Sequence, residues 1–73
     1  MPSLPSMSGK KFLNLLLSHG CEEISIRGSH HKVENTTNGK RSVVSVHGGK
    51  DIKKSLMADI LTQLEIDSND ILN

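Results

Sequence analysis

The spacing of hydrophobic side chains predicts a helix near the beginning of the chain. They recur at intervals that place them on one helical face: Phe12, Leu13, Leu16 and Leu17. Ser8 precedes this stretch, where its hydroxyl can accept a hydrogen bond from a free N–H of the first turn. Gly20 follows it, where a residue in the left-handed conformation commonly ends a helix. We therefore expect a helix over about residues 9–19.

The middle of the chain changes to a period of two, which is typical of half-buried strands. Three segments are candidates: residues 23–27, 30–35 and 41–46. The first places Ile24 and Ile26 on one face and Ser25 and Arg27 on the other. The third is rich in valine, which favours extended backbone. Three short strands are therefore expected.

Glycine-containing pairs separate these strands. Gly28 and Ser29 predict a tight turn or a bulge between the first two strands. Asn38 and Gly39 predict a type I′ hairpin turn between the second and third, because both residues tolerate positive φ. Strands joined in this way form an antiparallel meander.

A second helical pattern follows, marked by Ile52, Leu56, Ile60, Leu61 and Leu64. We expect this helix over about residues 52–65, although Ser55 could cap a later start. Asp67 or Ser68 is placed to cap a short last turn. The expected fold class is therefore α+β, with the order α-β-β-β-α and a three-stranded antiparallel sheet.

The length of 73 residues predicts one domain, over residues 7–73. Residues 1–6 contain both prolines and no periodicity, so a flexible tail is expected there. Cys21 is the only cysteine, which excludes an intramolecular disulfide. The longest apolar run is far shorter than the roughly 20 residues that span a bilayer. These observations predict a soluble protein of the cytoplasm.

Charge is distributed unevenly along the chain. All nine lysines and arginines lie in residues 1–54, which carry a net charge of +5, whereas residues 55–73 carry −4. A basic body favours a phosphate-bearing partner. Phe12 is the only aromatic residue, so nucleic-acid bases cannot be held on an aromatic platform. Any binding of nucleic acid must therefore depend on charge, hydrogen bonds and shape.

Several kinds of chemistry are disfavoured by the positions of the reactive residues. His30 and His31 are adjacent on a strand and point to opposite faces, so they make a poor start for a zinc site. Cys21 follows a helix C-terminus, where the helix dipole disfavours a thiolate. Neither a metal nor a cofactor is expected, and Cys21 is interpreted as a packed side chain.

Histidine remains as a candidate general acid or base, because its ordinary pKa of roughly 6.5 lies near neutrality. If Val33 faces the core, His30 points to the opposite, outward face. If Val44 and Val46 also face the core, His47 shares that outward face, where it could approach His30 and Lys50. The alternative is that these histidines are ordinary solvated surface residues.

The order of these motifs resembles the HicA (YcfA-like) toxin family, over about residues 7–72. The matching motifs are Gly9-Lys10 before a helix that ends at Gly20, Gly28-Ser29-His30-His31 after a strand, Val46-His47-Gly48-Gly49-Lys50 after a hairpin, and Asp51-Ile52-Lys53-Lys54-Ser55-Leu56. The second of these motifs is the most specific. Lys32 and Val33 stand where family members often carry an aromatic residue.

The resemblance implies a fold like a double-stranded-RNA-binding domain, with two helices on one face of the sheet. It implies a type II toxin–antitoxin function: ribosome-independent cleavage of mRNA (an mRNA interferase) that a HicB-type antitoxin inhibits. His30 matches the catalytic histidine of the family. The expected RNA contacts are Gly28, Ser29, His47, Lys50, Lys53 and Lys54.

These inferences predict a metal-independent endoribonuclease in which His30 is the general base and lysines stabilise the transition state. This chemistry requires a 2′-hydroxyl, which DNA lacks, so DNA is excluded as a substrate. The antitoxin is expected to cover the basic face and His30. The alternatives are a non-catalytic module that binds double-stranded RNA by shape, and an inactive homologue.

Overall fold

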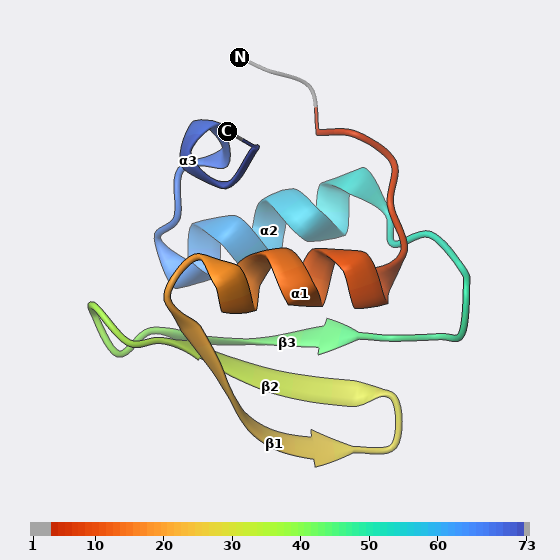
Figure 1. Ribbon diagram of the computed structural model, residues 1–73, viewed down its shortest axis with the longest axis horizontal. Helices are drawn as coiled ribbons and strands as arrows, with labels where there is room; N and C mark the ends of the chain where they lie inside the picture. The colour runs from red at the N-terminus through yellow and green to blue at the C-terminus, as the bar shows by residue number, and fades with distance from the viewer. Residues whose placement is uncertain (1–3, 73) are drawn as a thin grey trace.

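The computed structural model describes residues 4–72, which form three helices and a three-stranded sheet (Figure 1). The elements are α1 (Gly9–Ser18), β1 (Cys21–Arg27), β2 (His30–Asn35), β3 (Arg41–Ser45), α2 (Lys54–Leu64) and α3 (Ser68–Leu72). The strands are antiparallel in the order β1-β2-β3. The predicted α+β class and the order α-β-β-β-α are confirmed, with the expected short last turn present as α3.

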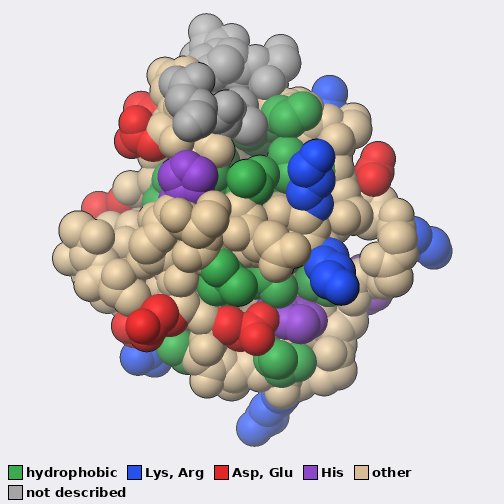
Figure 2. Space-filling model, in the orientation of Figure 1, with side chains coloured by type: hydrophobic (Ala, Val, Ile, Leu, Met, Phe, Trp, Pro, Cys, Tyr) green, Lys and Arg blue, Asp and Glu red, His purple; other side chains and the backbone are tan. Residues whose placement is uncertain are grey.

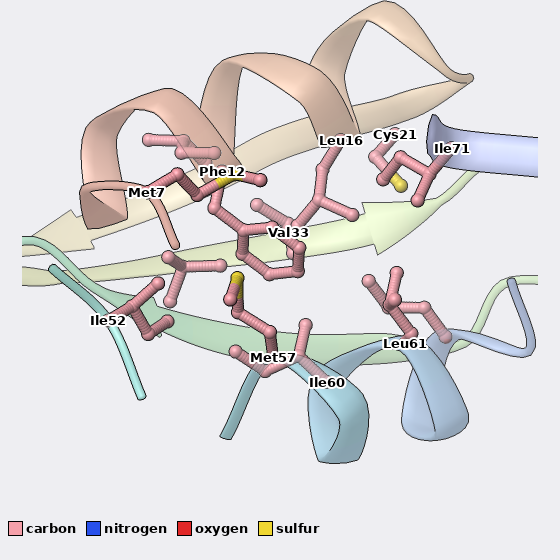
Figure 3. Packing of buried hydrophobic residues seen from close by; sticks show 13 residues of the cluster. Met7, Phe12, Leu16, Cys21, Val33, Ile52, Met57, Ile60, Leu61 and Ile71 are labelled. Atoms are coloured by element: carbon pink, nitrogen blue, oxygen red, sulfur yellow. The ribbon is translucent and has the colours of Figure 1, made fainter. Parts of the chain in front are cut away.

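Both long helices lie on the same side of the sheet, and the other side has no helix over it (Figure 1). The core lies between α1, α2 and the sheet, and Figure 3 shows its side chains converging from all three. Phe12 and Leu16 enter the core from α1, Val33 and Val44 from the sheet, and Met57 from α2. One face of each strand is therefore committed to packing, and the opposite face is left open.

The capping prediction for α1 is confirmed, because the N–H of Lys11 donates to the Oγ of Ser8 over 3.1 Å. The helix ends at Ser18, and Gly20 takes a positive φ of 90° just beyond it. The apolar stripe is narrower than predicted, since Leu17 is 37% exposed. Gly9 begins the helix against β3: a Cβ added to it would lie 2.5 Å from the carbonyl oxygen of Ser45.

The edge strand β1 is longer than predicted and irregular. Its pairing with β2 shifts between Glu23 and Ser25, which marks a bulge. Ile24 and Ile26, which were predicted to share one face, are 39% and 56% exposed. The two-residue turn at Gly28 and Ser29 is present as predicted, with a φ of 58° at the glycine.

The predicted type I′ turn between β2 and β3 is wrong, because only Gly39 has a positive φ and the loop is longer than two residues. The carbonyl of Asn35 instead accepts from the N–H groups of Asn38 and Gly39, at 3.3 and 2.8 Å. The side-chain amides of Asn35 and Asn38 both donate to the carbonyl of Leu64. The loop therefore satisfies the C-terminus of α2, a tertiary role that local turn preferences do not contain.

The second helix begins two residues later than predicted, and no side chain caps its start at Lys53. Met57 occupies the core position that the pattern gave to Leu56, which is 39% exposed. Ile52 is buried just before the helix. Residues 1–3 of the predicted tail lie outside the described residues, whereas Leu4 packs against the core. Within residues 4–72, no helix is long and apolar enough to cross a membrane.

Candidate functional site

The middle strand separates the two adjacent histidines, as predicted. Val33 is fully buried beneath the helices, and His31 lies on the same face, half-buried. His30 lies on the open face and is exposed. The alternation of side chains along a strand is sufficient to explain this difference. Of these two histidines, His30 is therefore the one that is accessible from solvent.

His31 has a structural partner. Its Nδ1 lies 2.8 Å from the Oε2 of Glu23 on β1, and both side chains are partly buried. A carboxylate only accepts hydrogen bonds, so the Nδ1 atom of His31 carries the proton that is donated. The bond joins β1 to β2, which gives His31 a structural role.

His30 lines an open hollow of about 500 Å³ on the bare face of the sheet, together with Ser25, Arg27, Lys32 and Val43. No acidic residue is among these lining residues. On the face of the molecule shown in Figure 2, by contrast, basic and acidic side chains are interspersed. The hollow beside His30 is therefore a local concentration of positive charge around an exposed imidazole.

The positions of the two cations follow from strand pairing. Arg27 is the cross-strand partner of His30, and Lys32 lies two residues further along β2 on the same face. Among the described residues, neither Arg27 nor Lys32 takes part in an ion pair, whereas the neighbouring Arg41 is bound to Glu34 at 2.8 Å. Both cations beside His30 are therefore available to an anionic ligand.

Arg27 and Lys32 were absent from the predicted site. The sequence contains the information that would have identified them, because both alternate in step with outward-facing residues of their strands. The sequence left open whether Gly28 and Ser29 form a tight turn or a bulge. The pairing of Arg27 with His30 could therefore not be predicted. Exact register decides which cation lies next to the imidazole.

His47 and Lys50 lie together, but in a different hollow from His30. This second hollow, of about 350 Å³, is lined by Ser45, His47, Lys50, Asp51, Ile52, Lys53 and Leu56. Residues 47–50 form a tight turn at the edge of this hollow. The N–H of Lys50 donates to the carbonyl of His47 over 3.1 Å, and Gly48 takes a φ of 58°. The expected RNA contacts His47, Lys50 and Lys53 are thus grouped, and Lys54 is not among the lining residues.

The two hollows are neighbours across the end of the sheet. Ser45 lines the second hollow and is the cross-strand partner of His30, which lines the first. The N–H of Val46 donates to the carbonyl of Ser29 over 2.8 Å, so the turn at Gly28 and Ser29 is tied to the end of β3. The two hollows are therefore adjacent at this end of the sheet.

Cys21 is buried at the start of β1, 5% exposed, and burial raises the pKa of its thiol. The thiol is thus held in its neutral form, consistent with the predicted packing role. A further hollow of about 570 Å³ lies on the helical side of the molecule, lined by Leu4, Ala58, Leu61, Thr62, Ile66, Asp67, Ser68 and Asn69. It contains no lysine, arginine or histidine, so it offers no cation to a phosphate.

Comparison with known families identifies the family of this chain. A family described as the HicA toxin of bacterial toxin–antitoxin matches residues 9–66, which is more than half of the chain and includes every element from α1 to α2. No curated protein and no solved structure matches it. The match spans both hollows and the turn that joins His30 to β1. The chain belongs to the HicA toxin family of bacterial toxin–antitoxin systems, and its resemblance to that family is confirmed.

Proposed function

We propose that this toxin is a metal-independent endoribonuclease that cleaves mRNA in the cytoplasm, with His30 as the general base. One observation carries the proposal: the imidazole of His30 is exposed in a hollow that also contains Arg27 and Lys32 and no acidic residue. Such a hollow attracts a phosphodiester and brings a proton acceptor to it.

The proposed reaction uses the 2′-hydroxyl of the RNA as the nucleophile. The neutral imidazole of His30 takes the hydroxyl proton while the 2′-oxygen attacks the adjacent phosphorus. The bond from phosphorus to the 5′-oxygen then breaks, and water supplies the proton to the leaving oxygen. The products are a 2′,3′-cyclic phosphate and a 5′-hydroxyl. General base catalysis of this kind contributes about 10²–10⁴-fold.

Arg27 and Lys32 stabilise the charge that accumulates on the phosphorus oxygens in the transition state. Preorganised cations are more effective than water in this role, because they need no reorganisation during the reaction. Gly28 and Ser29 place backbone beside His30, and His47, Lys50, Lys53 and Lys54 contact the RNA away from the scissile bond. Phe12 is buried, so the affinity for RNA depends on charge and on salt concentration.

The antitoxin partner is proposed to be a HicB-type protein that covers the open face of the sheet. The hollow beside His30 has two cations without ion-pair partners among residues 4–72. An acidic surface on the antitoxin would neutralise them and speed association. In a complex with the antitoxin we expect His30 to be inaccessible to RNA; an exposed His30 would contradict this form of inhibition.

The direct test is cleavage of a transcript in excess EDTA by the wild type, by His30→Ala and by His31→Ala. We expect cleavage by the wild type and by His31→Ala, and a loss of at least about 100-fold in His30→Ala. Equal rates in wild type and His30→Ala would remove His30 from the mechanism. Binding of double-stranded RNA without any cleavage would instead identify a non-catalytic binding module.

Cell growth provides an independent comparison. Induced expression of the wild type should arrest growth, and His30→Ala should not, although both proteins accumulate. Lys40→Ala is a matched control for the loss of a cation, because Lys40 lies beside Glu65 outside both hollows. Arrest by Lys40→Ala together with its absence in Arg27→Ala would assign the cation requirement to the hollow of His30.

A further inference from the structure

The second hollow combines apolar and charged residues in a way that phosphate binding alone does not explain. Lys50 and Lys53 suit the RNA backbone, but Asp51 lines the same hollow. A carboxylate repels phosphate, and none of the ion pairs within residues 4–72 neutralises Asp51. Its natural partners are N–H groups, because a carboxylate only accepts hydrogen bonds.

Leu56 adds an exposed apolar surface to this hollow. It is 39% exposed, since Met57 takes the core position on this turn of α2. Ile52, 8% exposed, lies beside it in the lining. Small-molecule sites typically combine an apolar lining with a few polar groups that determine orientation. A nucleobase, with flat apolar faces and a polar edge, has this character.

The backbone around the hollow is held in place before any ligand binds. Residue Asp51 forms an isolated bridge with Ser8, and the N–H of Ile52 donates to the carbonyl of Met7 over 3.0 Å. On the other side, Gly9 allows α1 to contact the carbonyl of Ser45. The backbone around the hollow is therefore tied to the segment that begins α1, and a ligand need not order it.

The position of the hollow relates it to the proposed cleavage site. Cα atoms of cross-strand partners lie roughly 4.5–5.5 Å apart, and Ser45 and His30 are such a pair. A base next to the scissile phosphate is thus close to the second hollow when the phosphate lies beside His30. Lys50 and Lys53 are then near the next backbone phosphate along the strand.

We propose that this second hollow binds the nucleobase adjacent to the scissile phosphate, and that Asp51 selects bases with an exocyclic amino group. The site rests on the proposed ribonuclease function. Adenine, cytosine and guanine each present an amino donor to Asp51, while the base face packs on Leu56. Uracil presents one N–H between two carbonyl acceptors, which the carboxylate repels. Uracil is therefore disfavoured at this position.

The test measures binding in the His30→Ala background, so that the RNA stays intact. The probes are labelled oligouridine and the same strand with one cytosine or adenine, followed by fluorescence anisotropy. We expect the single substitution to tighten binding about tenfold, in the range that one good base contact provides. Asp51→Asn should remove this preference, because an amide both donates and accepts.

Two matched pairs separate the base site from general effects. Asp59→Asn removes an acidic group of α2 outside the hollow and should keep the preference. Leu56→Ala should weaken binding to every probe, whereas Leu17→Ala, at a similarly exposed leucine of α1, should not. Thermal unfolding of each variant confirms that it is folded.

Equal affinity for all probes, or a preference that survives in Asp51→Asn, would overturn the base site. Cleavage is measured separately with the protein that retains His30. A protein that prefers amino-bearing bases but cleaves no transcript would refute the nuclease and leave the base site standing. A protein that cleaves without regard to the neighbouring base, and binds all probes alike, would refute the base site and leave the nuclease standing.

Discussion

His30 and His31 are neighbours in the sequence, yet their side chains lie on opposite faces of the sheet with different surroundings. His31 lies under the helices, half-buried, with its Nδ1 bound to Glu23 at 2.8 Å. His30 lies on the bare face, exposed, beside Arg27 and Lys32. One strand therefore directs one imidazole into the fold and exposes the other to solvent.

Polar residues on the covered face of β2 and β3 are bonded internally, and on the open face Arg41 and Glu34 also pair with each other. On the covered face, Asn35 donates to the carbonyl of Leu64 and Ser42 donates to Gln63. No buried side-chain nitrogen or oxygen among the described residues lacks a hydrogen-bond partner. On the open face, the groups around His30 keep their hydrogen-bonding capacity. Burial forces polar groups into internal hydrogen bonds, whereas exposed groups such as those around His30 can bond to water or to a ligand.

The largest expected effect separates the two histidines by activity. His30→Ala should lower the rate of RNA cleavage by about 10²–10⁴-fold while changing the free energy of unfolding by less than about 0.5 kcal/mol. His31→Ala should retain cleavage, because its imidazole faces the helices. Initial rates and urea unfolding curves of both variants check this. Similar losses of activity in the two variants would break the comparison.

A second effect separates two adjacent valines of β3. Val44 is fully buried and Val43 is 42% exposed on the face of His30. Val44→Ala should lower the free energy of unfolding by about 2 kcal/mol, because buried methyl groups are lost and a cavity remains. Val43→Ala should change it by less than about 0.5 kcal/mol. Denaturant titrations measure both, and the reverse order would place the core on the wrong face.

A smaller effect concerns the partner of His31. Glu23→Ala removes the acceptor and leaves the half-buried imidazole without its hydrogen bond, at a cost of about 1 kcal/mol. Glu22→Ala is the matched control, since Glu22 is exposed and has no ion pair within residues 4–72. Cleavage should be unchanged in both. Equal stability of the two variants would mean that the Glu23–His31 bond contributes nothing.

The smallest effect is seen in the thiol of Cys21. Burial raises its pKa, so the folded protein holds less thiolate than the unfolded chain at mildly alkaline pH. Because the unfolded chain loses this proton first, the free energy of unfolding should fall slightly as the pH rises above the ordinary thiol range. Alkylation at pH 8 should be slow in the native protein and faster in urea. Equally fast labelling of the native protein would show an accessible thiolate.

Local patterns were enough to predict much of this fold. The alternation of β2 places His30 and His31 on opposite faces, and the hydroxyl of Ser8 caps α1 as its position indicates. The details that the pattern missed depend on tertiary contacts. Leu56 and Met57 are both apolar, and only packing against the sheet decides that Met57 is buried. The loop after β2 follows its bonds to Leu64, not the preference of an Asn-Gly pair for a two-residue turn.

The candidate site was predicted in part for the same reason. His30 was identified from motif and alternation, and the structure groups His47, Lys50 and Lys53 in one hollow. The expectation that His47 and Lys50 gather with His30 is not met, because they line a separate hollow beyond the end of β3. Arg27 enters the site only through its pairing with His30, which requires the register between strands.

The chemical nature of the cleaved ends tests most directly whether His30 deprotonates a ribose hydroxyl. An RNA strand, and the same strand with a single 2′-deoxynucleotide on the 5′ side of the scissile phosphate, are incubated with the protein in EDTA. The product ends are then identified by mass spectrometry. We predict a 2′,3′-cyclic phosphate and a 5′-hydroxyl from the first strand, and no cut at the deoxy position in the second. Cleavage at the deoxy position, or a 3′-hydroxyl paired with a 5′-phosphate, would contradict attack by the 2′-oxygen.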